Sequence, residues 1–282
     1  MCASNAVKRL FVIPVGHIEN DLMWNLAGVT AASRSEPNKP ARWVRVPCLA
    51  YLIEHATEGW ILYDTGFRAG DLDKLPDHVK EQFPADLDGE AELGPRLESI
   101  GLKPSDISQI VVSHMHWDHG GGLSLFGGLP AGQNVMAGEK DFSYGLMVTH
   151  RKSGEVFGGG GYFKHHFEVP GVSFNLIDPD VGDFDLAEDV RVLQFEGHTP
   201  QILGLLVDLP KTGPIVLPSD AVYMKRNLYP EITPPSIIYD SLGFLRSARK
   251  TKMLVEQTGA RVIYPHDPEQ MSGLKLLPEY YE

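Results

Sequence analysis

Three histidines and one aspartate fall within six positions of this chain, in the string His-Met-His-Trp-Asp-His at 114–119. The string follows an apolar run over residues 110–112, which predicts a buried strand, and it leads into the glycines at 120–122. If residues 114–116 stay extended, His114 and His116 project to the same side, as two ligands of one ion must. Asp118 and His119 then turn away around the glycines and could serve a second ion. Because burying four polar groups without a partner would be costly, the string predicts a metal site.

The composition is that of a folded, acidic protein. Apolar residues make up 43% of the 282 positions and charged residues 22%, so the chain can bury a sizeable core. Lys and Arg total 25 against 37 Asp and Glu, which gives a formal net charge of −12. This balance argues against binding to nucleic acid, which requires a basic face, and against docking on an anionic membrane.

The sequence also predicts where the protein works. The longest early apolar run, residues 10–15, is shorter than the roughly 7–15 apolar residues of a signal peptide or the about 20 of a membrane span. The two cysteines, Cys2 and Cys48, cannot form a disulfide framework, so a reducing compartment fits best. We therefore expect a cytoplasmic protein with no membrane partner.

The order of predicted elements favours two sheets covered by helices. Strands are predicted over 9–15, 44–54, 60–64, 110–112, 190–195, 203–207, 215–217 and 262–264. Helices are predicted over 71–83, 95–100 and 241–258, and loops over 19–41 and over the glycine run 158–161. Since strands cluster before and after a helical stretch in both halves, two sheets with helices outside fit better than one parallel sheet. No repeat or linker divides residues 1–282, which predicts a single domain.

The string at 114–119 resembles the signature of the metallo-β-lactamase superfamily. Four further segments match that family, one before the string and three after it, in the expected order along the chain. They are Asp64-Thr65-Gly66, Gly197-His198-Thr199-Pro200, Ser219-Asp220 and Pro265-His266-Asp267. The resemblance spans about residues 9–267. It implies an α/β (α+β) fold, a four-layer αββα sandwich of two mixed sheets with helices outside.

The resemblance also implies a dinuclear site. The first ion would be held by His114, His116 and His198, and the second by Asp118, His119 and His266, with Asp220 bridging both. Nitrogen and oxygen ligands without cysteine suit Zn²⁺, while Fe²⁺, Mn²⁺ and Co²⁺ stay open. Asp64 would act only through a neighbouring ligand. The remaining histidines read as surface or packing residues: His17, His55, His78, His150, His165 and His166.

Within the superfamily, the chain most resembles the N-acyl homoserine lactonase group. The segment Asp220-Ala221-Val222-Tyr223, the run at 158–162 and the chain end after His266 carry this resemblance. It implies a metal-dependent hydrolase that opens an N-acyl homoserine lactone or a related γ-lactone by attack of a metal-bridging hydroxide. Tyr223 would donate a hydrogen bond to the oxygen that becomes negative, and Asp118 would pass a proton to the departing ring oxygen.

One departure from the lactonase pattern leaves the substrate open. Gln201 and Ile202 stand where the family commonly has a glycine and a second histidine. The alternative is another small cyclic ester, lactam or cyclic carbamate, of the pyridoxolactone or benzoxazolinone type, opened by the same metal site. Thioester, phosphodiester or iron redox chemistry and a non-catalytic metal module are more distant alternatives. The expected partner is a small cyclic substrate, and a homodimer is an assembly that the sequence leaves open.

Overall fold

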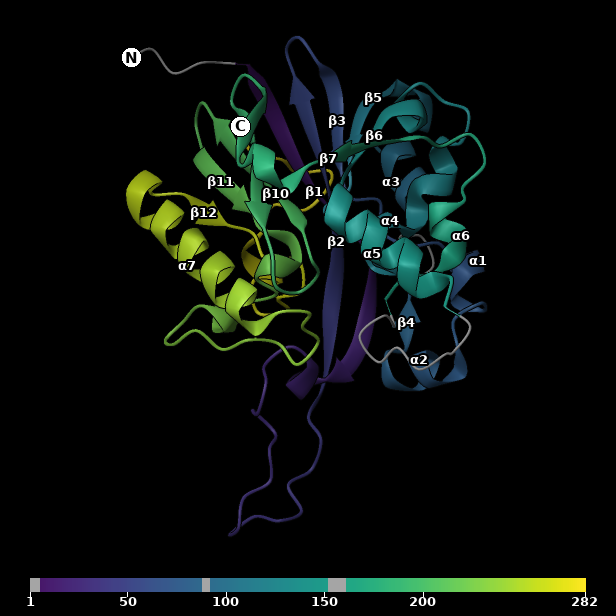
Figure 1. The fold of residues 1–282 in the computed structure, drawn as a ribbon. Helices are drawn as coiled ribbons and strands as arrows, with labels where there is room; N and C mark the ends of the chain where they lie inside the picture. Colours follow the sequence, from purple (N-terminus) through teal and green to yellow (C-terminus); the bar gives the residue numbers. More distant parts are fainter. Residues whose placement is uncertain (1–5, 88–91, 152–160) are drawn as a thin grey trace.

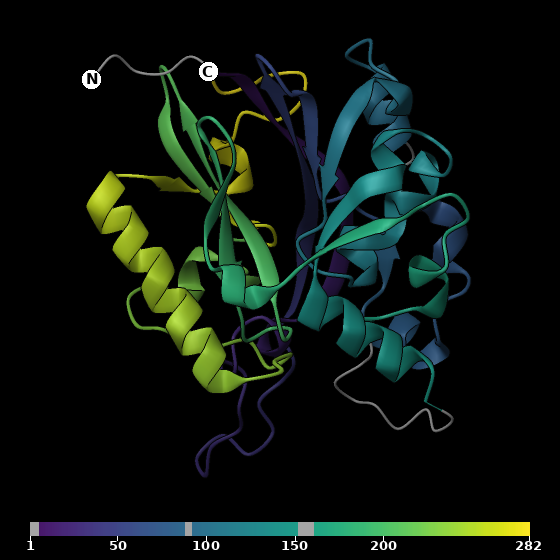
Figure 2. The same cartoon turned by 45° about the horizontal axis from the view of Figure 1, so that its top comes forward.

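In the computed structural model, which describes residues 6–87, 92–151 and 161–282, two β-sheets pack face to face. Helices cover the outer face of each sheet, so the molecule has four layers (Figures 1 and 2). The predicted αββα sandwich is confirmed. Among the described residues, no helix combines the length and the apolar character needed to cross a bilayer.

The first sheet has seven strands in the order β4-β1-β2-β3-β5-β6-β7. Strands β1, β2 and β3 pair antiparallel, whereas β3, β5, β6 and β7 run parallel. Their bounds are β1 Val7–Asp21, β2 Trp43–His55, β3 Gly59–Tyr63, β4 Ala85–Asp86, β5 Ile107–Val111, β6 Val135–Gly138 and β7 Phe174–Ile177.

The second sheet has five strands in the order β12-β11-β10-β9-β8. It is antiparallel except for the pairing of β11 with β12. The bounds are β8 Phe184–Ala187, β9 Val190–Phe195, β10 Ile202–Leu209, β11 Gly213–Leu217 and β12 Arg261–Val262.

One long helix, α7, covers the second sheet, and the shorter helices cover the first (Figure 2). The α-helices are α1 Ala69–Leu72, α2 Asp77–Gln82, α3 Leu93–Glu98, α4 Trp117–Gly120, α5 Glu139–Thr149, α6 Lys164–Phe167 and α7 Ser241–Thr258. Helix α7 begins after Asp240, whose side chain accepts hydrogen bonds from two backbone amides of the first turn, and ends at Gly259 in the left-handed region (φ 70°). Both caps satisfy groups that a helix end leaves without a partner.

Alternation along the strands explains how the layers form. In β1, Leu10 and Val12 belong to the core between the two sheets, whereas Phe11 and Ile13 face the core under the helices. Successive side chains of a strand point to opposite faces, so a strand that is apolar at every position must be covered on both sides. This is why the sequence folds as a sandwich with outer helices.

The predicted elements differ from the observed ones mainly at their ends. The strand over 190–195 and the helix over 241–258 have the predicted bounds, while β1 continues to Asp21, into the predicted loop. The predicted helix over 71–83 is two short helices, α1 and α2, because Pro76 interrupts it. Sequence patterns missed short elements of two to four residues, such as β4, β7 and β8, and also the helix α5. The predicted glycine loop at 158–161 lies outside the described residues except for Gly161.

Candidate metal centre

The candidate ligands follow the carboxyl ends of four strands. His114 to His119 come after β5, His198 after β9, Asp220 after β11 and His266 after β12. The two sheets therefore deliver side chains from segments far apart in sequence to one edge of the sandwich. All seven predicted residues are buried there, with exposed fractions of 0–9%.

The carboxylate of Asp220 lies between two sets of imidazoles. Its Oδ2 is 3.2 Å from Nε2 of His198 and 3.8 Å from Nε2 of His114. Its Oδ1 is 3.0 Å from Nε2 of His266 and 3.3 Å from Nε2 of His119. Each carboxylate oxygen thus faces one set, which is the arrangement that a bridging ligand of two ions needs.

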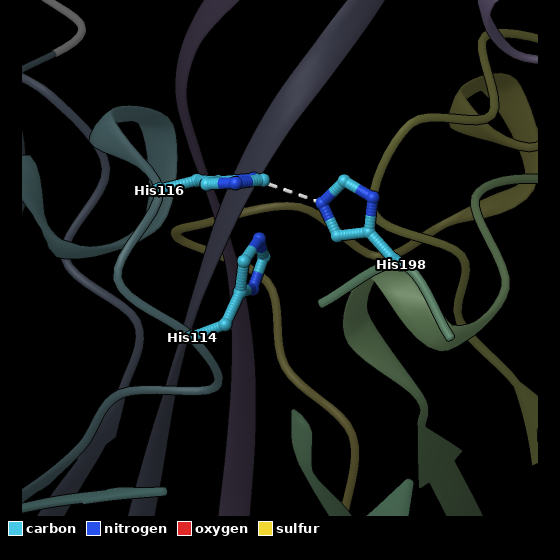
Figure 3. A group of neighbouring side chains, drawn as sticks. All are labelled: His114, His116 and His198. Atoms are coloured by element: carbon cyan, nitrogen blue, oxygen red, sulfur yellow. Dashed lines mark hydrogen bonds between the residues drawn. The ribbon is translucent and has the colours of Figure 1, made fainter. Parts of the chain in front are cut away.

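Three histidines converge on the first of these sets (Figure 3). Nδ1 of His116 lies 2.9 Å from Nε2 of His198, and one ligand nitrogen from each of His114, His116 and His198 lies within 4.8 Å of the others. In the second set, Oδ2 of Asp118 is 3.6 Å from Nε2 of His119 and 3.7 Å from Nε2 of His266.

Backbone and carboxylate acceptors orient three of the imidazoles. Nδ1 of His266 lies 2.7 Å from the carbonyl oxygen of Pro47, and Nδ1 of His198 lies 3.2 Å from that of Ile237. Nδ1 of His119 lies 2.8 Å from Oδ2 of Asp64. A carbonyl oxygen or a carboxylate only accepts, so each Nδ1 carries the proton and each Nε2 keeps its lone pair for an ion.

Three candidate ligand atoms have no hydrogen-bond partner within the described part of the chain, although they are buried. They are Nε2 of His114, Nε2 of His119 and Oδ1 of Asp220. Buried polar atoms without a partner cost free energy, and a bound cation removes that cost. Imidazole and carboxylate ligands without a thiolate in the predicted set suit Zn²⁺ and related divalent ions. The residues present therefore fit a pair of divalent metal ions.

Burial and charge divide the histidines into two kinds. Burial lowers the pKa of His114 and of His116 well below the usual value, and the neighbouring imidazolium charges add to this. Burial also acts on His119 and His266, but the carboxylate of Asp220 outweighs it and raises both pKa values. The site is thus rich in negative charge on the side of the second set, where a cation would be attracted most strongly.

Several residues that sequence patterns did not single out support the ligands. Ser113 donates from its backbone amide to Asp64 Oδ1 at 2.7 Å and from its hydroxyl to Asp64 Oδ2 at 2.9 Å. Its hydroxyl also lies 3.0 Å from Nδ1 of His114. Asp141 accepts hydrogen bonds from the Met115 amide and from the Tyr162 hydroxyl. Ser113 is adjacent to the string and could have been suspected, whereas nothing in the sequence around Asp141 points to this role.

Gly161 is required by close packing. A Cβ atom at this position would lie 2.4 Å from Cδ2 of His116 and 2.6 Å from its Cγ, closer than real contacts allow. The carbonyl oxygen of Gly161 also accepts a hydrogen bond from the amide of Trp117 at 2.9 Å. Only glycine leaves room for the His116 ring in this position.

A cavity of about 200 Å³ opens over the candidate ligands. Its lining contains candidate ligands together with Tyr223, whose hydroxyl lies 2.7 Å from Nδ1 of His198. The apolar part of the lining is formed by Ile18, Trp24, Val46, Val79, Phe83, Ile237 and Ile238. His78, predicted as a surface or packing residue, also lines the cavity.

Gln201, the departure from the lactonase pattern, has a structural place. It is 2% exposed and does not line the cavity. Its amide group donates to the carbonyl oxygen of Ile177 and to the side chain of Gln194, and its Oε1 accepts from the amide of Lys140. Because these partners belong to both sheets or their connections, Gln201 joins the two halves of the sandwich. Its presence is therefore explained by packing and is no evidence for a different substrate.

Comparison with known proteins identifies the family. Residues 43–266 match the model of the metallo-beta-lactamase superfamily. The chain is 30% identical to the N-acyl homoserine lactonase AiiB of Agrobacterium fabrum, over 98% of this chain and 99% of that protein. An N-acyl homoserine lactonase of Bacillus sp is 28% identical, over 97% and 99% of the two chains.

Solved structures agree with this assignment. A mutant of B. thuringiensis AiiA with N-decanoyl-L-homoserine bound at its active site has a TM-score of 0.81 and 26% identity, covering 98% of this chain and 100% of that chain. An N-acyl homoserine lactone hydrolase with N-hexanoyl-L-homoserine at its catalytic metal centre has a TM-score of 0.80 and 26% identity, with the same coverage. The protein belongs to the metallo-beta-lactamase superfamily.

Proposed function

We propose that this protein is a metal-dependent hydrolase that opens the lactone ring of N-acyl homoserine lactones. The observation that carries the proposal is Asp220, whose two oxygens face two separate sets of buried histidines at the floor of an apolar cavity. The similarity over nearly the whole chain to proteins named N-acyl homoserine lactonase supports this substrate class.

The proposed ligands of the first ion are His114, His116 and His198, and those of the second are Asp118, His119 and His266, with Asp220 between them. Zn²⁺ is the proposed metal, because imidazole and carboxylate ligands suit it. A pair of such ions, when bound, lowers the pKa of a water molecule and polarises an ester carbonyl group.

Tyr223 is proposed to stabilise the negative charge that develops on the carbonyl oxygen. The Tyr223 hydroxyl lies 2.7 Å from Nδ1 of His198, which places it beside a proposed ligand of the first ion and within the lining of the cavity. Burial and the carboxylate of Asp220 raise the pKa of Tyr223 well above its usual value, which keeps the phenol protonated at neutral pH. A donor directed at developing charge acts more strongly in the transition state than in the ground state.

Asp118 is proposed to carry a proton to the ring oxygen that leaves. It lines the cavity, and its carboxylate lies beside His119 and His266 at the second set. A carboxylate in this position can take a proton from the attacking water and return it to the departing alkoxide. The chain then needs no covalent intermediate with a side chain.

The acyl group of the substrate is proposed to lie along the apolar side of the cavity. Ile237 and Ile238 line the cavity, and the carbonyl oxygen of Ile237 lies 3.2 Å from Nδ1 of the proposed ligand His198. Trp24 and Phe83 also line it, and their ring centroids are 5.3 Å apart. Burying an acyl chain against these side chains contributes binding free energy of about 0.8 kcal/mol for each buried CH₂ group.

The test is proton release by the zinc-loaded protein on a panel of small rings. The panel holds short- and long-chain N-acyl homoserine lactones, a bare γ-lactone, an aromatic lactone and a benzoxazolinone. We expect turnover of the acyl homoserine lactones to exceed that of the other rings. Turnover confined to the aromatic lactone or to the cyclic carbamate would contradict the proposal and favour the alternative substrate class.

Three wider statements complete the proposal. We propose a role in quorum quenching, since the substrate class consists of quorum signals. We propose a cytoplasmic location, which the buried free thiol of Cys48 supports. We also propose that the chain acts as one domain, supported by a core between the sheets to which both halves of the sequence contribute. A homodimer stays a prediction.

A further inference from the structure

A second group of metal-binding side chains lies in the outer helical layer of the first sheet. It joins Asp71 of α1 to His165 and His166 of α6, two helices that lie near each other in Figure 1. Oδ1 of Asp71 is 3.3 Å from Nε2 of His165, and Oδ2 is 3.7 Å from Nε2 of His166. One ligand atom from each residue lies within 4.8 Å of the others, and none of the three residues lines the cavity.

The spacing of these atoms suits a tetrahedral ion. Two ligands that are each about 2.0–2.1 Å from a tetrahedral Zn²⁺ lie roughly 3.4 Å apart. The observed separations of 3.3 and 3.7 Å fall in the range of 3.0–3.8 Å that Asp220 shows toward its histidines in the candidate metal centre. The carboxylate–imidazole separations in the outer cluster are therefore similar to those in the candidate metal centre.

His166 supplies an independent observation. It is 2% exposed, and neither of its ring nitrogens has a hydrogen-bond partner in the part of the chain that the structure describes. A buried imidazole without a hydrogen-bond partner is costly, because its ring nitrogens have lost water and the Asp71 carboxylate, 3.7 Å from Nε2, is too far away for a hydrogen bond. A cation at Nε2 would satisfy the acceptor and explain why a histidine stands at this position.

The ammonium group of Lys74 would compete with a bound cation for the carboxylate of Asp71. Its Nζ donates to Oδ1 of Asp71 at 2.9 Å, while its side chain is 61% exposed and free to turn toward solvent. His166 and Lys74 together hold the pKa of Asp71 well below its usual value, although burial opposes them. Asp71 is consequently an ionised carboxylate that can exchange one cationic partner for another.

We propose that Asp71, His165 and His166 bind a third divalent cation, in addition to the pair proposed for the centre. Two imidazoles and one carboxylate select Zn²⁺, or a similar borderline ion, over Ca²⁺ or Mg²⁺, which prefer oxygen ligands. The side chain of His165 is 41% exposed and leaves a path for the ion and for a water molecule as fourth ligand. The bound ion would join α1 to α6 and so stabilise the outer layer.

The experiment counts zinc on the intact protein. Wild-type protein and variants are dialysed against buffered free Zn²⁺, and bound zinc per chain is measured by elemental analysis. We expect three ions on the wild type and two on His165→Gln and on Asp71→Asn. His150→Gln, which removes another exposed histidine, is the matched control and should keep three.

Lys74→Gln provides a test in the opposite direction. Removing the competing ammonium should tighten binding of the third ion, so that it saturates at lower free Zn²⁺ than in the wild type. His165→Gln changes an exposed side chain and does not depend on refilling the space of buried His166. Equal zinc counts in wild type and His165→Gln would overturn the proposal, whatever the count at the catalytic centre.

Discussion

At the scale of residues, the role proposed for Tyr223 depends on the hydrogen of its hydroxyl group. The Tyr223 ring packs against the imidazole of His198, so the substitution Tyr223→Phe removes the proposed donor to the substrate and leaves the His198 ring packed against an aromatic side chain. We expect kcat to fall by about 10²-fold, the usual effect of losing one oxyanion donor, with zinc content unchanged. Steady-state kinetics and elemental analysis on the same sample check both parts.

Tyr239→Phe is the control for this prediction, because Tyr239 is 55% exposed and does not line the cavity. Its kcat should equal that of the wild type. An unaltered kcat in Tyr223→Phe would show that Tyr223 is only a packing residue of the cavity wall.

Substitution of Gly161 tests how closely the proposed site of the first ion is packed. Alanine at this position would place Cβ 2.4 Å from the ring of His116, so the ring must shift and its ligand nitrogen moves with it. Displacing the support of a metal ligand commonly weakens metal binding by about 10–100-fold, and we expect a loss in this range for Gly161→Ala. Competition with a chromophoric chelator measures it.

Gly273→Ala is the matched substitution, since a Cβ there meets nothing within 4 Å. It should bind zinc as the wild type does. Wild-type zinc affinity in Gly161→Ala would mean that the His116 ring is not held in the position that the structure gives it.

At the scale of elements, the segment after β1 lines the cavity over the candidate ligands. Trp24 ends a short 3-10 helix, packs on Phe83 next to α2, and accepts at its backbone oxygen a hydrogen bond from the amide of Ser236. This segment thereby joins two other walls of the cavity. The predicted loop over 19–41 is thus anchored at its start, where its apolar residues lie.

Removing the Trp24 side chain should affect long substrates more than short ones. We expect Trp24→Ala to raise KM for a long-chain acyl homoserine lactone by about tenfold, a loss of roughly 1.4 kcal/mol, with little change for a short chain. Trp43→Ala, at a position that is 54% exposed and outside the cavity lining, should change neither KM. Equal effects of Trp24→Ala on both chain lengths would place the acyl group elsewhere.

The elements also show where prediction from sequence succeeds. Strand β9 and helix α7 were predicted with their observed bounds, because a dense apolar run and an amphipathic pattern with a terminal glycine are strong local signals. Strand β4 has two residues, which pair with His17 and Ile18 of β1. Its existence depends on that distant partner, so no local pattern could reveal it.

For the whole molecule, the string at 114–119 by itself predicts a metal site, and its resemblance to the metallo-β-lactamase superfamily points to the ligands in the later segments. The residues that support the ligands or join the two sheets have no such pattern in the sequence. Gly161 matters through a ring 45 positions earlier in the chain (161 − 116), and Gln201 through partners on both sheets. Such contacts arise only when the sandwich closes, so the sequence alone gives no sign that Gln201 has a structural role.

For the protein as a whole, we predict that hydrolysis requires two bound ions. The most direct measurement removes metal with a chelator and returns Zn²⁺ stepwise while following hydrolysis of N-hexanoyl-L-homoserine lactone. The measurement uses His165→Gln protein, which lacks the proposed outer site, so that only ions bound at the candidate metal centre are counted. We predict no turnover in stripped protein and a rate that rises until two ions per chain are bound. Full turnover in protein without metal, or in Asp220→Asn with its zinc content unchanged, would contradict the account.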